Sequence, residues 1–241
     1  MATAPEQFWP DLKPLAESGQ IEALLSSIRA VGDDSDRIGL CRTVMRHLAF
    51  DDWQNKDLDV MTAVADFAIA DCQELGGDFL EQANLICYNA SANLCDCWGD
   101  GFHREPRHFE KGIEYAKNAL WFRDHLGKGP GSKAMATWAI GKHQQSLGRL
   151  EEARDTFRRC LELETEAAYE AGKPASISSD APDGYLIAAG YVALLEGDSA
   201  SLGRLKEVLD SMIASGGEEK DDAEIISGQL RETATQLGVA L

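Results

Sequence analysis

The sequence of 241 residues predicts an all-α protein, and three observations support this fold class. Apolar residues recur at spacings of three and four nearly throughout the chain, as they do on one face of a helix. Runs in which apolar and polar residues alternate, which would predict strands, are absent. Clusters of glycine and proline divide the chain into segments of helical length. We therefore expect about eleven helices and no strand.

The first part of the chain, residues 1–78, predicts four helices from this periodicity alone. The expected helices are residues 11–18, a helix from Ile21 that ends at Gly32, a third that the acidic run Asp33–Asp36 caps, and a fourth over residues 55–75. Each has an apolar stripe and needs a neighbour against which to bury it.

Residues 79–215 predict three helical hairpins. The expected pairs are residues 79–97 with 107–126, residues after Gly131 with a second helix that reaches Ala171, and residues 185–195 with 202–213. The segment 172–183 contains two prolines and three serines, which predicts a loop and the best candidate for a hinge. A last helix is expected within residues 219–239. We interpret residues 1–241 as a single domain: divergent N-terminal helices (1–78), hairpins (79–215) and a capping helix (219–239).

One hairpin has small residues where two antiparallel helices would cross. Its sequence, Ala134–Leu163, is AMATWAIGKHQQSLGRLEEARDTFRRCLEL. Gly141 and Ala153 stand at the crossing, Gly148 lies in the turn, and Phe157 continues the apolar stripe of the second helix. This pattern resembles one tetratricopeptide (TPR) repeat, a hairpin that must stack on others to bury its apolar face. It departs from the family pattern at Thr137 and Gln144, where aromatic residues are common.

Fainter copies of the same pattern surround Ser91 and Gly190. These crossing residues lie 50 and 49 residues from Gly141 by subtraction, whereas the TPR period is about 34. The hairpins are therefore expected to be TPR-like and irregular. The resemblance implies a right-handed α-solenoid of about five TPR-like hairpins plus a C-terminal capping helix.

The composition is strongly acidic, with 23 Lys and Arg against 41 Asp and Glu and a formal net charge of −18. Such a charge repels nucleic acid and anionic membranes and favours a basic protein or peptide as partner. The N-terminal residues carry no secretory signal, and the longest apolar run is too short to span a membrane. Six cysteines on helical patterns are expected to be reduced core residues, which favours a cytoplasmic location.

Four residues with metal-binding side chains, Cys95, Cys97, His103 and His108, lie within a short segment. Their spacing is not a common zinc pattern, and on a helix the two cysteines would point in different directions unless the helix frays. The histidines stand in no recognisable catalytic signature. We therefore expect no metal, no cofactor and no enzymatic activity.

In a TPR-like solenoid the first helices of successive hairpins line a concave groove. The residues in the groove-facing phase are Tyr88, Met135, Trp138, Lys142, Gln145 and Tyr191, which we predict as peptide-binding. The alternative is that the aromatic residues among them pack between neighbouring hairpins.

The function expected from these observations is that of a non-catalytic, cytoplasmic protein- or peptide-binding scaffold with an acidic surface. Two alternatives stay open. One is a small acidic chaperone or assembly factor that dimerises through an apolar end face. The other, less favoured, is an enzyme or metal-binding helical protein whose site is assembled from residues distant in sequence. A homodimer is compatible with the sequence.

Overall fold

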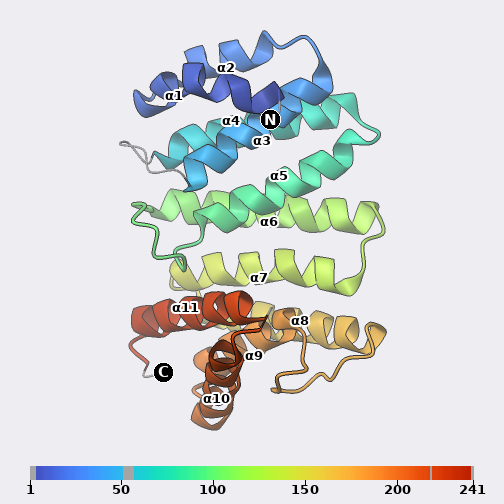
Figure 1. The fold of residues 1–241 in the computed structure, drawn as a ribbon, viewed down its shortest axis with the longest axis vertical. Coiled ribbons are helices and arrows are strands. Elements are labelled where there is room, and N and C mark those ends of the chain that lie inside the picture. The colour runs from blue at the N-terminus through green and yellow to red at the C-terminus, as the bar shows by residue number, and fades with distance from the viewer. Residues whose placement is uncertain (1–3, 51–56, 218, 240–241) are drawn as a thin grey trace. The chain divides into compact units, whose positions relative to one another are not determined.

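The computed structural model describes residues 4–50, 57–217 and 219–239, and these residues form helices and loops without any strand (Figure 1). The elements in chain order are the 3₁₀ helix η1 (Ala4–Phe8) and the α-helices α1 (Trp9–Glu17), α2 (Ile21–Arg29), α3 (Asp34–Phe50), α4 (Leu58–Leu75), α5 (Phe79–Leu94), α6 (Pro106–His125), α7 (Pro130–Ser146), α8 (Leu150–Glu170), α9 (Asp183–Glu196), α10 (Ser199–Ser215) and α11 (Lys220–Leu237). The prediction of an all-α protein is confirmed. The predicted start of the fourth helix, at residue 55, lies outside the described residues.

The chain divides into two compact units. The N-terminal unit comprises residues 1–94 and 101–122, and the C-terminal unit comprises residues 95–100 and 123–241. The division falls inside helix α6, whose last turn belongs to the C-terminal unit. The organisation of all 241 residues as one domain stays a prediction.

Two helices of the N-terminal unit begin with an aspartate side chain that caps them. The side chain of Asp33 accepts a hydrogen bond from the backbone N–H of Asp36 (2.9 Å) at the start of α3. Asp57 caps α4 in the same way, through the N–H of Asp59 (2.8 Å). Helices α5 and α6 of the N-terminal unit are joined by a buried hydrogen bond. Ser91 Oγ of α5 donates to the carbonyl of Gly112 in α6 (2.8 Å). The small residue expected at this helix crossing is therefore present there.

The C-terminal unit begins with the hairpin of α7 and α8, where the resemblance to a TPR repeat is strongest. A Cβ atom added to Gly141 would lie 3.1 Å from the ring of Phe157, so these helices approach closely at the predicted crossing. Gly148 takes a φ of +73° in the connecting turn, a conformation that favours glycine. Helix α7 begins at Pro130 because proline, with no N–H to leave unpaired, suits a first helical turn.

Helices α9, α10 and α11 complete the C-terminal unit. Gly197 has a φ of +71° between α9 and α10, and the side chain of Asp198 accepts hydrogen bonds from the N–H groups of Ala200 and Ser201 (3.1 Å each). Helix α11 packs against both α9 and α10. A Cβ atom on Gly190 of α9 would lie 2.7 Å from Leu230 and 2.8 Å from Leu205. Glycine at this position therefore allows α9 to lie beneath the last two helices.

Helix α5 ends at Leu94, three residues before the end that the sequence predicts. Residues 95–100 leave the helix and belong to the C-terminal unit. Their side chains have partners there. Arg104 donates to the carbonyls of Asn93 and Leu94, and Gln236 donates to the carbonyl of Asp96, so these carbonyls have partners without the helical hydrogen bonds that continuation of α5 would have supplied.

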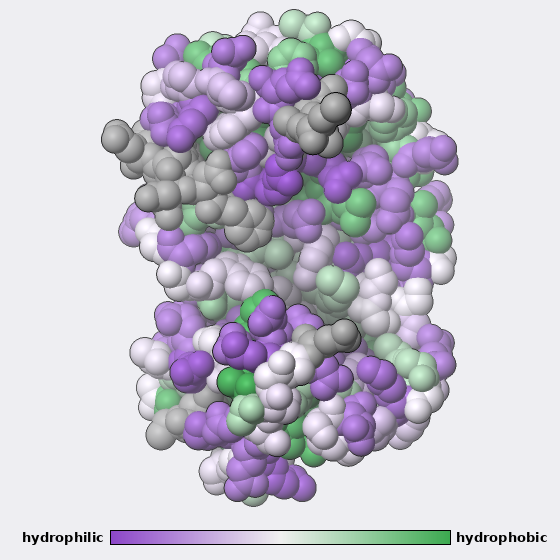
Figure 2. Space-filling view, in the orientation of Figure 1, coloured by the Kyte–Doolittle hydropathy of each residue, from purple (hydrophilic) through white to green (hydrophobic). Residues whose placement is uncertain are grey.

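The surface view shows a face on which hydrophilic side chains predominate and apolar ones are scattered among them (Figure 2). Within the described residues, no helix combines the length and the apolar character that crossing a membrane requires.

Candidate functional site

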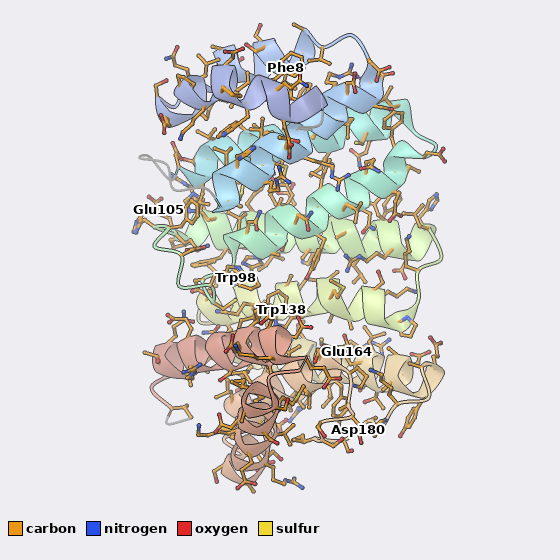
Figure 3. The ribbon with its side chains drawn as sticks, viewed as in Figure 1. Phe8, Trp98, Glu105, Trp138, Glu164 and Asp180 are labelled. Carbon is orange, nitrogen blue, oxygen red and sulfur yellow. The ribbon has the colours of Figure 1, made fainter. Side chains whose placement is uncertain are left out.

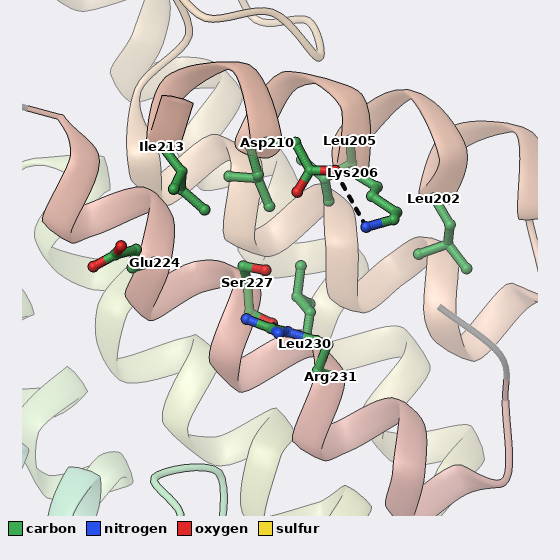
Figure 4. A pocket seen from close by; sticks show the side chains of 10 residues that line it. Leu202, Leu205, Lys206, Asp210, Ile213, Glu224, Ser227, Leu230 and Arg231 are labelled. Carbon is green, nitrogen blue, oxygen red and sulfur yellow. Dashed lines mark hydrogen bonds and ion pairs between the residues drawn. The ribbon is translucent and has the colours of Figure 1, made fainter. Parts of the chain in front are cut away.

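A groove runs along the surface of the C-terminal unit between α10 and α11 (Figure 4). Its volume is about 430 Å³. The residues that line it are Leu202, Leu205, Lys206, Leu209, Asp210 and Ile213 of α10, together with Glu224, Ser227, Leu230 and Arg231 of α11. We refer to this site as the α10–α11 groove.

The floor of the α10–α11 groove is apolar and belongs to the core. Leu202, Leu205, Leu209 and Leu230 are each at most 6% exposed. Leu205 and Leu230 rest on Gly190 of α9, so the floor is supported from beneath by a helix that leaves no space for further movement inward. Ile213 and Ser227 are half-buried and can be reached from solvent. The floor leucines are therefore packed against α9, and Ile213 offers the more exposed apolar surface of the groove.

Four charged residues form the rim of the α10–α11 groove. Lys206 and Asp210 of α10 form an ion pair of 3.2 Å, with both side chains more than half exposed. Glu224 of α11 lies 3.5 Å from Lys220. Arg231 of α11 donates from Nε to the carbonyl of Ser227 (3.2 Å). Because exposed ion pairs contribute less than about 1 kcal/mol, the rim charges can exchange these partners for those of a ligand at little cost.

The acidic and basic rim residues stand at different positions along the two helices, although Lys206 and Asp210 are close enough to form an ion pair of 3.2 Å. Helices α10 and α11 are antiparallel neighbours, and Asp210 and Glu224 lie nearer to their connecting turn than Lys206 and Arg231 do. At 1.5 Å per residue the acidic and basic positions are about 6 Å apart along α10 and about 10 Å apart along α11. Figure 4 shows Glu224 beside Ile213 at one end and Arg231 toward Leu202 at the other.

A second polar feature of the C-terminal unit is the buried ammonium of Lys142 on α7, whose side chain is 0% exposed. Its Nζ donates to the carboxylate of Asp96, to Gln145 Oε1, to Ser146 Oγ (3.0 Å) and to Gln236 Oε1 (3.2 Å). Gln236 of α11 in turn donates to the backbone carbonyl of Asp96 (3.1 Å). Burial alone would raise the pKa of Asp96, but the charge and hydrogen bonds of Lys142 lower it below its usual range. The network therefore ties residues 95–100 to α7 and α11.

Cys95 and Cys97 flank Asp96 in this segment, and both are buried. Their side chains hydrogen-bond to each other, which lowers the pKa of Cys97, whereas burial raises the pKa of Cys95. Cys95 Sγ also lies 3.6 Å from Nε2 of the buried His143. The two thiols converge because they stand in a loop, where the divergence expected from a helix does not apply.

Aromatic rings extend from the surface of the C-terminal unit into its core. Trp98 is 41% exposed and lies edge-on to Trp138, with ring centroids 6.2 Å apart (Figure 3). Trp138 makes a similar contact with Tyr191, which stacks on Phe157 at 4.5 Å. Burial raises the pKa of Tyr191 well above its ordinary value. These rings pack residues 95–100 and α7 against α8 and α9.

The structure buries four of the six residues predicted to bind a peptide: Trp138, Lys142, Gln145 and Tyr191. Met135 is 44% exposed, and Tyr88, in the N-terminal unit, is half-buried. A peptide could reach the ammonium of Lys142 only if Asp96, Ser146 and the two glutamines released it. Peptide contact at these six positions stays a prediction, whereas the α10–α11 groove is accessible as it stands.

The sequence cluster of cysteines and histidines is divided between the two units. His108, in the N-terminal unit, contacts Asp59 Oδ1 (3.1 Å) and accepts a hydrogen bond from the N–H of Glu105 (3.0 Å). Cys95 and Cys97 belong to the C-terminal unit. Across the described ranges, no group of three or more His, Cys, Asp or Glu side chains could hold a metal ion.

A carboxyl group of α8, that of Glu164, is buried against the start of α9. A Cβ atom on Gly184 would lie 2.5 Å from the carboxyl of Glu164, which α8 supplies. Glu164 is 7% exposed, and burial raises its pKa to about 7 (Figure 3). We therefore expect this carboxyl to make the stability of the C-terminal unit depend on pH.

The residues of the α10–α11 groove were not predicted as a site because their spacing is that of core residues. Leu202, Leu205 and Leu209 follow helical periodicity like every other apolar stripe in the chain. Nothing in their spacing separates the residues of the groove from core residues elsewhere in the chain.

The described residues thus form an all-helical protein with an apolar surface groove and a charged rim. Comparison with protein-family models, with curated proteins and with solved structures finds no match.

Proposed function

We propose that this chain is a protein-interaction module, a solenoid of TPR-like hairpins, that binds a segment of a partner protein in the α10–α11 groove. The observation that carries the proposal is the groove itself, with its rigid apolar floor of leucines and its exposed charged rim. Apolar anchors from a partner would bury their surface on the floor, and the rim would select among partners by charge.

The order of helix contacts supports the solenoid. In the C-terminal unit each helix contacts the next in the chain, and α9 also contacts α7 and α11. In the N-terminal unit α3 likewise contacts α1 and α5. Contacts between alternate helices are what stacking of successive hairpins produces.

The net charge of −18 supports a partner that is basic overall. Such a charge attracts a cationic protein from a distance and raises the association rate, while the groove supplies the short-range contacts.

A pair of matched substitutions tests the proposal. Ser227→Trp places a large side chain in the α10–α11 groove, and Ser211→Trp places the same side chain on exposed α10 surface outside it. We expect the tagged native chain and Ser211→Trp to capture the same partners from an extract of the source cell, and Ser227→Trp to lose at least one of them. Equal capture by all three folded proteins would refute the groove as the binding site. A native dimer that Ser227→Trp dissociates in light scattering would favour the dimeric chaperone instead.

A further inference from the structure

We propose that Cys95 and Cys97 are a reversible redox site, in which hydrogen peroxide oxidises the two thiols to an intramolecular disulfide and a thiol reductant restores them. Both cysteines are reduced in the structure. The site lies in the segment 95–100 and does not depend on the α10–α11 groove or on any partner.

The backbone places the two thiols within reach of each other. Even in an extended chain, residues two apart have Cα atoms separated by at most about 7 Å, and disulfides join Cα atoms about 4.4–6.8 Å apart. On a helix the two side chains would point in different directions, but α5 ends at Leu94 and leaves both cysteines in a loop. Their side chains hydrogen-bond to each other there. A disulfide therefore requires the two sulfur atoms to approach further, which a change within this short loop can provide.

Cys97 is the thiol that attacks the oxidant, because the thiolate is the reactive form of cysteine. A hydrogen bond from Cys95 lowers the pKa of Cys97, and the charge of Lys142 and a hydrogen bond from Tyr191 lower it further. Burial and the carboxylate of Asp96 oppose these effects without outweighing them. Burial raises the pKa of each of the other five cysteines. The surroundings of Cys97 therefore prepare this one thiol for oxidation.

The reaction balances with hydrogen peroxide as a two-electron oxidant. The Cys97 thiolate attacks one peroxide oxygen, the O–O bond breaks, and the leaving hydroxide combines with the proton that the thiol released, which gives a sulfenic acid and water. Cys95 then passes its proton to Nε2 of His143, which lies 3.6 Å from Cys95 Sγ and accepts it when the ring hydrogen is on Nδ1. The Cys95 thiolate attacks the Cys97 sulfur, the S–O bond breaks, and the leaving hydroxide takes the proton from His143 as water.

Burial of the two sulfur atoms selects a small oxidant. Cys95 is 0% exposed and Cys97 is 3% exposed, so an oxidant reaches them only when the segment 95–100 opens. This segment is a loop without helical hydrogen bonds, in which Gly99 has a φ of +64° and Trp98 is 41% exposed. Such backbone opens more readily than a helix does. Hydrogen peroxide is close to water in size, whereas oxidised glutathione, a peptide disulfide, needs far more room around the attacking sulfur.

Treatment of the reduced full chain with hydrogen peroxide at pH 7 tests the proposal. Alkylation followed by mass spectrometry identifies which cysteines remain as thiols. We expect a disulfide between Cys95 and Cys97 that forms at least about tenfold faster than the other four cysteines are oxidised, and that reduced glutathione reverses. Oxidised glutathione at the same concentration should form this disulfide at least about tenfold more slowly than peroxide does.

Single substitutions separate the roles of the residues. In Cys95→Ser, Cys97 should stop at the sulfenic acid, which the diketone dimedone traps, and no disulfide should form. In Cys97→Ser, Cys95 should stay reduced, and the matched control Cys160→Ser should react as the native chain does. Tyr191→Phe should slow the reaction about tenfold at pH 7 and shift its pH profile upward, because the Cys97 thiolate loses a hydrogen-bond donor.

A native chain in which peroxide leaves Cys95 and Cys97 as thiols, or converts Cys97 to a sulfinic acid without a disulfide, would overturn the proposal. Oxidation of Cys41 and Cys72 at the same rate would also overturn it, because the surroundings of Cys97 would then confer no reactivity. An unaltered pH profile in Tyr191→Phe would overturn the role of Tyr191. Partner capture in the α10–α11 groove is measured separately, so failure of the redox site leaves the proposed function intact.

Discussion

Gly190 shows how one residue shapes the C-terminal unit. It stands where α9 passes beneath α10 and α11, and Leu205 and Leu230 occupy the space that a side chain would need. Gly228 in α11 is the matched contrast, because a Cβ atom there would meet nothing within 4 Å. The two glycines therefore differ in packing while both are helical.

Alanine at the two glycines should have opposite effects. We expect Gly190→Ala to lower the free energy of unfolding by about 1–3 kcal/mol, because the methyl group forces the two leucines apart. Gly228→Ala should raise it by about 0.5–1 kcal/mol through helix propensity alone. Urea unfolding of the two variants measures both values. A stabilised Gly190→Ala variant would show that the helices are not in close contact at this residue.

Glu164 should make stability depend on pH. The pKa of its carboxyl is raised from 4.5 to about 7 by burial, so the folded chain binds this proton more tightly than the unfolded chain. The free energy of unfolding contributed by this group therefore falls as pH rises from about 4.5 to about 7. Glu164→Gln should stabilise the protein above pH 7 by about 1–2 kcal/mol and have little effect near pH 4. Thermal unfolding between pH 4 and pH 8 measures how stability changes with pH in the native chain, in Glu164→Gln and in the control Glu166→Gln, whose side chain is exposed. The same dependence on pH in all three proteins would contradict a raised pKa at Glu164.

At the scale of elements, the sequence predicts the helices well because each has its own periodicity and its own breakers. The acidic cap before α3 and the glycine turns after α4 and α9 are local signals, and the structure confirms them. The end of α5 was predicted three residues late because its cause is not local. Residues 95–97 contain no glycine or proline. Asp96 there contacts α7 and α11, and Arg104 donates to the carbonyls of Asn93 and Leu94 at the end of α5.

Function-related features were harder to predict for the same physical reason. Helical phase places Lys142 and Trp138 on one face of α7, but it does not reveal that Asp96 and Trp98 cover that face. The α10–α11 groove is likewise formed by the angle between two helices, which periodicity does not report.

Lys142 should hold the segment 95–100 against α7 through its ion pair with Asp96. Lys142→Met leaves the carboxylate of Asp96 partly buried without its counter-charge, and we expect the free energy of unfolding to fall by about 3 kcal/mol. Adding Asp96→Asn should recover part of this loss, because no unpaired charge then remains. Chemical denaturation measures the free energy of unfolding of the native chain, the single variant and the double variant. As control, Lys206→Met breaks an exposed ion pair and should change the free energy of unfolding by less than about 1 kcal/mol. A double variant less stable than Lys142→Met would argue against this origin of the loss.

At the scale of the whole molecule, the formal charge of −18 should govern how fast a basic partner associates. Rates of association with the partner that pull-down identifies should fall as salt is raised from 0.05 to about 0.5 M, because the Debye length shortens from roughly 14 to 4 Å. Dissociation, governed by apolar contacts in the groove, should change less. Stopped-flow or surface-based kinetics measure both rates, and an association rate indifferent to salt would exclude electrostatic steering.

The central claim is that a segment of a partner protein occupies the α10–α11 groove, and site-specific photo-crosslinking in the source cell tests it most directly. A photo-reactive phenylalanine derivative replaces Ser227 inside the groove or, as control, Ser211 outside it. We predict a crosslink from position 227, and none from position 211, to an amphipathic segment of another protein. Crosslinks from position 211 alone, or from position 227 only to a second copy of this chain, would contradict the account.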